Sequence, residues 1–262
     1  MISFDKIVKK MLKKWWNIIF SNDILEILDP EKKQKNKTKC SKIIYRLKAE
    51  WVILPLKNWV YIIPDSEDRE LNDVDLIDKY YVKLLKKYIS KEVGAKYFIS
   101  WKKSLEIHMK NYSFPEKIYI ITHSTQKKVL VWNYEIHFKT IAGKHMWKKM
   151  NLFSKLSSYV QEREIEWYNF KFAWIELALL EACLVWDIDE WIDVWLINKA
   201  LKKYRKVLNY EALEDITQYK YILSVNRLKE LSRSQSPELY RLCLSIIKKN
   251  GWLFVWESAR AI

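Results

Sequence analysis

Hydrophobic positions near the start of the chain repeat with the period of an amphipathic helix. They are Phe4, Ile7, Val8, Met11 and Leu12. This spacing, with Ser3 as a candidate cap, predicts a helix over 3–14. A second, short helix is predicted over 23–28, because Ser21 and Asn22 can cap it and Pro30 cannot continue it.

A third helix is predicted within the segment EKKQKNKTKCSKIIYRLKAEW, after its polar and basic start, and is expected to end near Glu50. Its apolar residues fall on one narrow face: Cys40, Ile43, Ile44 and Leu47. Two apolar runs, 52–54 and 60–63, then flank Lys57-Asn58-Trp59 and predict a β-hairpin. Three helices and a hairpin within 1–64 predict a winged helix-turn-helix, whose third helix would enter a major groove.

The remainder of the chain is predicted to be an acidic linker over 65–78 and an α+β domain over 79–262. The expected strands lie within 96–109, which also holds a helix, and at 117–122, 129–131, 134–138 and 168–172. The expected helices lie at 76–90, 174–185, 190–206, 209–217, 221–232 and 237–249. The predicted fold class is therefore α+β, with a small sheet and several helices after the winged helix.

Positive charge is concentrated at the start of the chain. The net charge of the whole chain is +15, and residues 1–64 carry 14 Lys/Arg against 6 Asp/Glu. Residues 151–262 are nearly neutral, with 16 basic against 15 acidic side chains. A basic end on a nearly neutral body is typical of a protein that binds nucleic acid.

The third helix and the hairpin supply candidate DNA contacts. Those expected to neutralise phosphates or reach base edges are Lys35, Asn36, Lys37, Thr38, Lys39, Ser41, Lys42, Tyr45, Arg46, Lys57 and Asn58. Lys57 and Asn58 would place the tip of the wing at an adjacent groove. An ordinary solvated lysine face on a helical subdomain is the alternative interpretation.

The balance of glycine and tryptophan is unusual. The chain has 3 glycines and 14 tryptophans, whereas glycine usually makes up about 7% of residues. Several tryptophans stand where glycine is expected, such as Trp51 after the third helix and Trp59 in the hairpin turn. We hypothesise that many are UGA codons that the organism reads as glycine. A tryptophan-rich protein with aromatic anchors is the alternative.

Catalytic chemistry is not predicted. The one dense carboxylate cluster is Asp187, Asp189, Glu190 and Asp193. Paired aspartates can hold Mg²⁺ for phosphoryl transfer, but this pair follows a buried helix and begins another, which favours helix capping. The alternative is a C-terminal nuclease or nucleotidyltransferase-like domain. The four histidines lack metal-ligand spacing, and we expect no cofactor and no metal.

The three cysteines are expected to be buried free thiols: Cys40, Cys183 and Cys243. Apolar runs are too short to span a membrane, and the N-terminus lacks the apolar core of a secretory signal. These features predict a cytoplasmic protein that has no membrane partner.

Four segments carry a family resemblance. They are IIYRLKAEWVILPLKNWVYIIP, YFISWKKSLEIHM, PEKIYIIT and FAWIELALLEACL. In this order, and with glycine allowed at the tryptophans, the chain resembles the AbiEi family, the antitoxins and transcriptional regulators of type IV (abortive-infection) toxin–antitoxin systems. The tryptophans and the lysine-rich segment 31–39 depart from the family pattern.

The resemblance implies a bacterial repressor and antitoxin. Its N-terminal domain would bind inverted repeats in double-stranded DNA of its own promoter. Its C-terminal domain would counteract a nucleotidyltransferase-like toxin encoded alongside it, in defence against phage. Whether the toxin is contacted directly stays open, as do the operator sequence and the oligomeric state.

Overall fold

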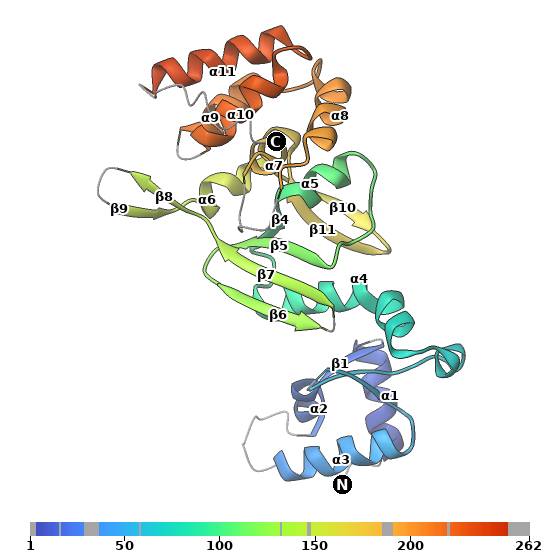
Figure 1. Cartoon of the computed structure of the whole chain (residues 1–262). Helices are drawn as coiled ribbons and strands as arrows, with labels where there is room; N and C mark the ends of the chain where they lie inside the picture. Colours follow the sequence, from blue (N-terminus) through green and yellow to red (C-terminus); the bar gives the residue numbers. More distant parts are fainter. Residues whose placement is uncertain are drawn as a thin grey trace. The chain divides into compact units, whose positions relative to one another are not determined.

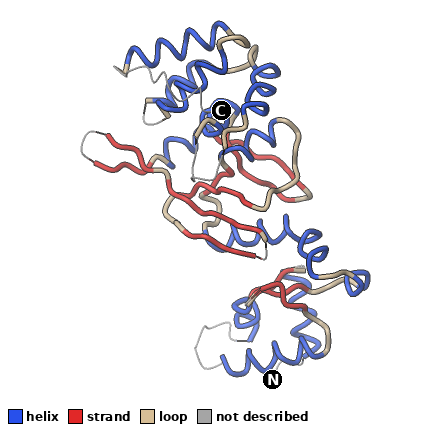
Figure 2. The backbone as a smooth tube through the Cα atoms, viewed as in Figure 1, coloured by secondary structure: helices blue, strands red, loops and turns tan. Residues whose placement is uncertain are grey.

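The computed structural model describes residues 4–15, 17–28, 37–57, 59–131, 133–145, 148–184, 191–218 and 221–250. Contacts within the chain divide it into two compact units. Unit 1 is Met1–Tyr88 with Val131–Asn133, and unit 2 is Ile89–Leu130 with Tyr134–Ile262. Helices and strands are mixed in both (Figures 1 and 2), so the α+β class is confirmed.

Unit 1 begins with three helices and three short strands. In chain order these are α1 (Phe4–Trp15), β1 (Ile18–Phe20), α2 (Ser21–Leu28), α3 (Lys37–Ala49), β2 (Leu54–Lys57) and β3 (Val60–Ile62). The strands form an antiparallel sheet in the order β1-β3-β2. One core joins α1, β1, α2, α3 and β3, with buried side chains that include Met11, Ile24, Leu47, Ile53 and Tyr61.

Strand β1 was not predicted. Its three residues, Ile18, Ile19 and Phe20, are all buried, so they lack the alternation of apolar and polar positions that marks a half-buried strand. The predicted two-stranded hairpin is thus part of a three-stranded sheet. Helix α2 also begins at Ser21 rather than at Asp23, because the Asp23 carboxylate accepts a hydrogen bond from the Phe20 amide at 2.9 Å.

The segment expected as a linker is folded into unit 1. It contains the 3-10 helix η2 (Ser66–Glu70) and the start of α4 (Asp73–Glu92). The Asp68 side chain is buried and accepts hydrogen bonds from Lys79 Nζ (2.5 Å) and Tyr80 Oη (2.5 Å). The two units therefore divide between Tyr88 and Ile89, not within 65–78. Local acidity was misleading because the buried carboxylate has partners on the next helix.

The sheet of unit 2 has six strands and mixed pairing. They are β4 (Tyr97–Ile99), β5 (Lys117–Thr122), β6 (Lys127–Val131), β7 (Tyr134–Thr140), β10 (Val160–Ile165) and β11 (Tyr168–Ala173). Their order is β10-β11-β4-β5-β7-β6, with β5 and β7 parallel and β11 and β4 parallel. A separate antiparallel pair, β8 (Ala142–His145) and β9 (Lys148–Asn151), forms the ribbon that projects from unit 2 in Figure 1.

Helices gather on one side of this sheet (Figure 1). They are α5 (Trp101–His108), α6 (Phe153–Leu156), α7 (Ile175–Ala182), α8 (Val194–Tyr204), α9 (Tyr210–Thr217), α10 (Ile222–Ser232) and α11 (Pro237–Lys249), with the 3-10 helix η3 (Ser157–Tyr159) after α6. Every residue of α7 is buried. Two helices are shorter than predicted: α7 was expected over 174–185 and α8 over 190–206. Helix α7 starts later because Trp174 is extended, and α8 starts later because the Asp193 side chain accepts a hydrogen bond from the Leu196 amide and caps the helix.

The two buried glutamates of α7 fasten other helices to it. Glu176 accepts a hydrogen bond from the backbone amide of Asn209, the N-cap of α9, at 2.7 Å. Glu181 accepts from Ser100 Oγ at 2.5 Å, Trp101 N at 3.1 Å and Tyr221 Oη at 3.1 Å. Amide groups at helix starts have no partner within their own helix, so these carboxylates satisfy them.

All three cysteines are buried and none forms a disulfide, as predicted. Burial raises the pKa of the Cys183 thiol and that of the Cys243 thiol to about 12. None of the described helices combines the length and the apolar character that crossing a bilayer requires.

Candidate nucleic-acid interface

Helix α3 has one buried face and one exposed face. Cys40, Ile44 and Leu47 are 4%, 7% and 0% exposed and belong to the core of unit 1. The Cys40 thiol also donates to the carbonyl of Ser21 on α2 at 3.8 Å, and burial raises its pKa. These contacts, with Ile43 partly buried against the same core, fix the rotation of α3 about its axis, so the polar positions face outward.

The outward face of α3 is basic and polar. Its exposed basic, polar and aromatic residues are Thr38, Lys39, Ser41, Lys42, Tyr45, Arg46 and Lys48. Tyr45 is 77% exposed, although a large aromatic side chain is usually at least partly buried. The helix itself contains no acidic residue. In Figure 1, α3 lies at the edge of unit 1, with its length along the surface.

One acidic side chain lies directly beside this face. The Arg46 guanidinium donates from Nε to Glu50 Oε1 at 2.6 Å, and both side chains are exposed. Sequence analysis did not single out Glu50. Its spacing of four residues from Arg46 was the available signal, because residues four apart are neighbours on a helix surface.

The β2–β3 hairpin presents fewer candidate contacts. Leu56 is buried, Pro55 is exposed and Lys57 is half-buried, paired in register with Val60. The hairpin turn is held to α2, since the Ser21 amide donates to the Trp59 carbonyl at 3.0 Å.

The predicted contact residues thus divide into three groups. The structure places Thr38, Lys39, Ser41, Lys42, Tyr45 and Arg46 together on the exposed face of α3. Lys37 is the first residue of α3 and Lys57 the last of β2. Lys35, Asn36 and Asn58 lie outside the described residues. Contact with DNA remains a prediction for all of them.

The carboxylate cluster considered for metal binding is described only at Asp193. This residue caps α8 and lies 2.9 Å from Lys102 Nζ. Burial would raise its pKa, but the hydrogen bonds from Lys102 and the Leu196 amide lower it overall. Asp187, Asp189 and Glu190 lie outside the described residues. Within the described ranges, no three His, Cys, Asp or Glu side chains are grouped as metal ligands.

The described histidine side chains occupy separate environments. His108 is buried, with Nε2 2.9 Å from the Ala173 carbonyl, and burial lowers its pKa. His137 is 2.8 Å from Glu135, and the ring of His123 lies against Phe153.

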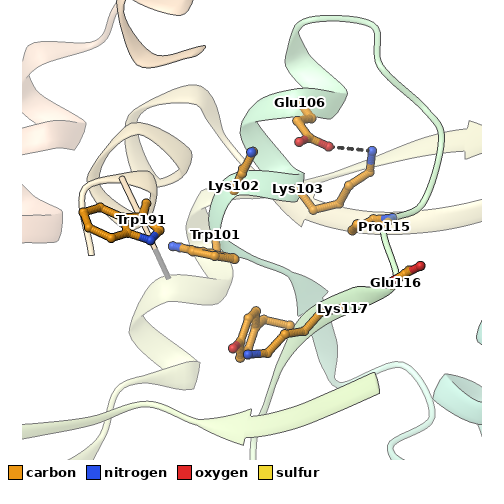
Figure 3. A pocket seen from close by; sticks show the side chains of 9 residues that line it. Trp101, Lys102, Lys103, Glu106, Pro115, Glu116, Lys117 and Trp191 are labelled. Carbon is orange, nitrogen blue, oxygen red and sulfur yellow. Dashed lines mark hydrogen bonds and ion pairs between the residues drawn. The ribbon is translucent and has the colours of Figure 1, made fainter. Parts of the chain in front are cut away.

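Unit 2 contains a cavity of about 500 Å³ between α5 and β5 (Figure 3). It is lined by Trp101, Lys102, Lys103, Glu106, Pro115, Glu116, Lys117, Tyr119 and Trp191. Lys103 is almost fully buried and lies 3.1 Å from Glu106 (Figure 3), and Lys102 pairs with Asp193. Lys102 and Lys103 therefore have acidic partners, and with two glutamates among the lining residues the wall has no strong excess of charge.

Comparisons with known proteins inform the fold rather than the chemistry. No protein-family model matches the sequence, and no curated protein matches it. The chain is similar to the crystal structure of the RV2827C protein from Mycobacterium tuberculosis, with a TM-score of 0.56 and 12% sequence identity, over 92% of this chain and 80% of that one. At this identity the likeness shows that the two chains share a fold.

Proposed function

We propose that unit 1 is a winged helix-turn-helix that binds double-stranded DNA, and that the protein is a transcriptional repressor of its own promoter. The observation that carries the proposal is the two-faced helix α3. Its apolar stripe is buried in the core of unit 1, while Lys39, Lys42 and Arg46 are exposed with no acidic residue within the helix.

The order of elements supports this assignment. Helices α1, α2 and α3 precede the β2–β3 hairpin, and β1 completes a small sheet with it. In a helix-turn-helix the second helix of the motif enters the major groove, which here is α3. The hairpin would then be the wing. The acidic segment 65–78 is not a linker in this arrangement but part of the support of unit 1.

The exposed side chains suit a division of labour on DNA. Lys39, Lys42 and Arg46 supply positive charge for phosphates, which gives affinity and makes it salt-dependent. Thr38 and Ser41 can donate to phosphates or base edges, and Tyr45 offers a hydroxyl and a ring at the middle of the face.

The resemblance to the AbiEi family extends the proposal to the whole chain. We propose that the protein is the antitoxin of a type IV toxin–antitoxin system and that unit 2 counteracts a nucleotidyltransferase-like toxin. The buried helix α7 and the strand β5 coincide with two of the segments that carry the resemblance. On this proposal the protein is not an enzyme.

The test is binding of the full-length protein to DNA from upstream of its own gene, by gel shift at fixed salt. The double variant K39E/K42E is expected to lose binding while its circular dichroism and melting stay those of the parent. The control K202E/K206E makes the same change in charge at two exposed lysines of unit 2. Equal affinity for parent and K39E/K42E would refute the placement of the interface on α3.

The antitoxin role needs a separate measurement. Co-expression of the neighbouring toxin gene should arrest growth, and this protein should relieve the arrest. K39E/K42E should still relieve it, because the substitutions leave unit 2 intact. Persistent arrest with the folded parent protein would refute the antitoxin role and leave the DNA-binding proposal standing.

A further inference from the structure

Four tryptophans have a backbone conformation that tryptophan rarely adopts. Among the described residues, the non-glycine positions with positive φ are Trp51 (55°), Trp59 (69°), Trp101 (62°), Lys110 (67°), Glu166 (47°), Trp167 (68°) and Tyr221 (75°). In this left-handed region the Cβ atom of an L-residue crowds the following carbonyl oxygen, which glycine avoids. Tryptophan makes up four of these seven positions, far above its share of the sequence.

Trp51 stands at the glycine position of a helix C-terminal motif. The Val52 amide donates to the Leu47 carbonyl at 2.9 Å, and the Trp51 amide donates to the Lys48 carbonyl at 3.1 Å. This pair of bonds defines a Schellman motif, in which the left-handed residue is usually glycine. The Trp51 side chain is 65% exposed. Gly94 shows the same conformation (φ 60°) just after α4.

Trp59 and Trp167 stand in two-residue hairpin turns. Trp59 precedes Val60, which pairs with Lys57 across the turn. Glu166 and Trp167 connect the paired residues Ile165 and Tyr168, and both have positive φ, as a type I′ turn requires. The second turn position is the usual place of glycine. The Trp59 and Trp167 side chains are 65% and 90% exposed.

Other described tryptophans provide a contrast. Trp101 has positive φ, but its indole donates to the Leu184 carbonyl at 2.9 Å and its ring packs against Tyr119. Trp195 is 68% exposed, yet it lies within helix α8, where Lys199 Nζ is 4.5 Å from its ring. Exposure alone therefore does not mark a glycine position, whereas exposure combined with a turn that needs positive φ does.

We infer that the natural polypeptide carries glycine at positions 51, 59 and 167, because the organism reads the corresponding UGA codons as glycine. The structure assigns these three positions individually, and position 167 is identified by the turn geometry rather than by the sequence. Position 51 follows α3, and position 59 lies in the β2–β3 turn. With glycine at position 59, the natural sequence of this turn would be Asn-Gly.

The direct test is to read the gene and the protein from its own organism. TGA codons at 51, 59 and 167, together with glycine in the matching peptides by mass spectrometry, are expected. TGG at these codons, or tryptophan in the native peptides, would overturn the inference.

A stability test checks the geometry independently. W51G, W59G and W167G are each expected to raise the folded-to-unfolded ratio about threefold, since relief of the left-handed strain exceeds the entropic cost of glycine. The matched control W195G should lower it, because Trp195 lies in the first turn of α8, where glycine would lose the contact of the indole with Lys199 and gain no relief from strain. Denaturation followed by circular dichroism measures both. A loss of stability in W51G and W167G as large as that in W195G would contradict the assignment.

Discussion

The Lys87 ammonium lies 2.7 Å from the Asp23 carboxylate, and the two side chains are only 19% and 15% exposed. Lys87 Nζ also donates to the carbonyl of Ile18 on β1, and Asp23 accepts from the Phe20 amide. One partly buried ion pair thus connects α4 with the first turn of α2 and with β1. It explains why α4 is mostly part of unit 1.

Replacing Lys87 tests this connection. K87M should destabilise unit 1 by about 1.5–3 kcal/mol, because the partly buried Asp23 carboxylate would lose its cation. Urea denaturation followed by circular dichroism measures the change. K9M, at an exposed lysine of α1, should change stability by less than about 0.5 kcal/mol. An equally stable K87M protein would show that the pair does not hold α4.

The Asp68 carboxylate predicts a dependence of stability on pH. Burial alone would raise its pKa, but hydrogen bonds from Lys79 and Tyr80 outweigh burial and lower it. A group whose pKa is lower in the folded state stabilises the protein above its unfolded value, about 3.9 for aspartate. Stability should therefore decrease as the pH falls from about 5 through 4 towards the lowered folded-state pKa.

The variant D68N should reduce this loss, since asparagine does not titrate. Denaturant midpoints between about pH 3 and pH 6 provide the measurement. D78N, at an exposed position of α4, should keep the pH dependence of the parent. If the stability of D68N depended on pH as steeply as that of the parent, the loss of stability at low pH would come from other titratable groups.

Glu181 is expected to be the most sensitive carboxylate of unit 2. It is fully buried and satisfies Ser100, Trp101 and Tyr221. Burial and this carboxylate raise the pKa of Tyr221 well above its usual value, so the hydroxyl remains a donor. E181A would leave two buried hydroxyl donors and the partly buried Trp101 amide without this acceptor and should cost at least about 3 kcal/mol.

The loss should be smaller in E181Q, which keeps the shape and an acceptor oxygen. E211A, at an exposed position of α9, should cost less than about 1 kcal/mol. Thermal melting of the three proteins ranks them. A near-parental melting temperature for E181A would mean that water or rearrangement satisfies the three donors.

On the proposed function, removing the negative charge of Glu50, which pairs with Arg46, should increase the affinity for DNA. Glu50 would oppose nearby phosphates and compete with them for Arg46. E50Q should therefore bind DNA of any sequence more tightly and steepen the salt dependence by about one counterion. E67Q, an exposed glutamate of η2, makes the same change in charge away from α3.

Titration of binding against salt for the parent, E50Q and E67Q supplies the comparison. An equal increase in DNA affinity in E50Q and E67Q would mean that only the net charge of the protein matters. A gain confined to E50Q would place the phosphates beside the end of α3.

Periodic segments were predicted well because they require only local information. The amphipathic stripe of α1 and the segment 237–249 of α11 show their helical period directly. The apolar run Ile118–Ile121 likewise predicted β5. This strand is buried on both faces, so its own continuous run of apolar residues is enough to identify it. The exposed basic face of α3 follows from the same periodicity, which is why six predicted contact residues lie on one surface.

Tertiary structure decided what depends on partners far along the chain. The sequence by itself determined the helices of eight or more residues, most strands, the basic third helix and the shortage of glycine at turns, since each is a local property of side-chain order; it did not predict the four-residue helix α6. Only the fold showed that β1 joins a sheet, that Asp68 is buried among groups on α4, and that Glu181 meets Ser100. Burial and hydrogen bonding are shared between distant residues, and no local pattern records which residues will meet.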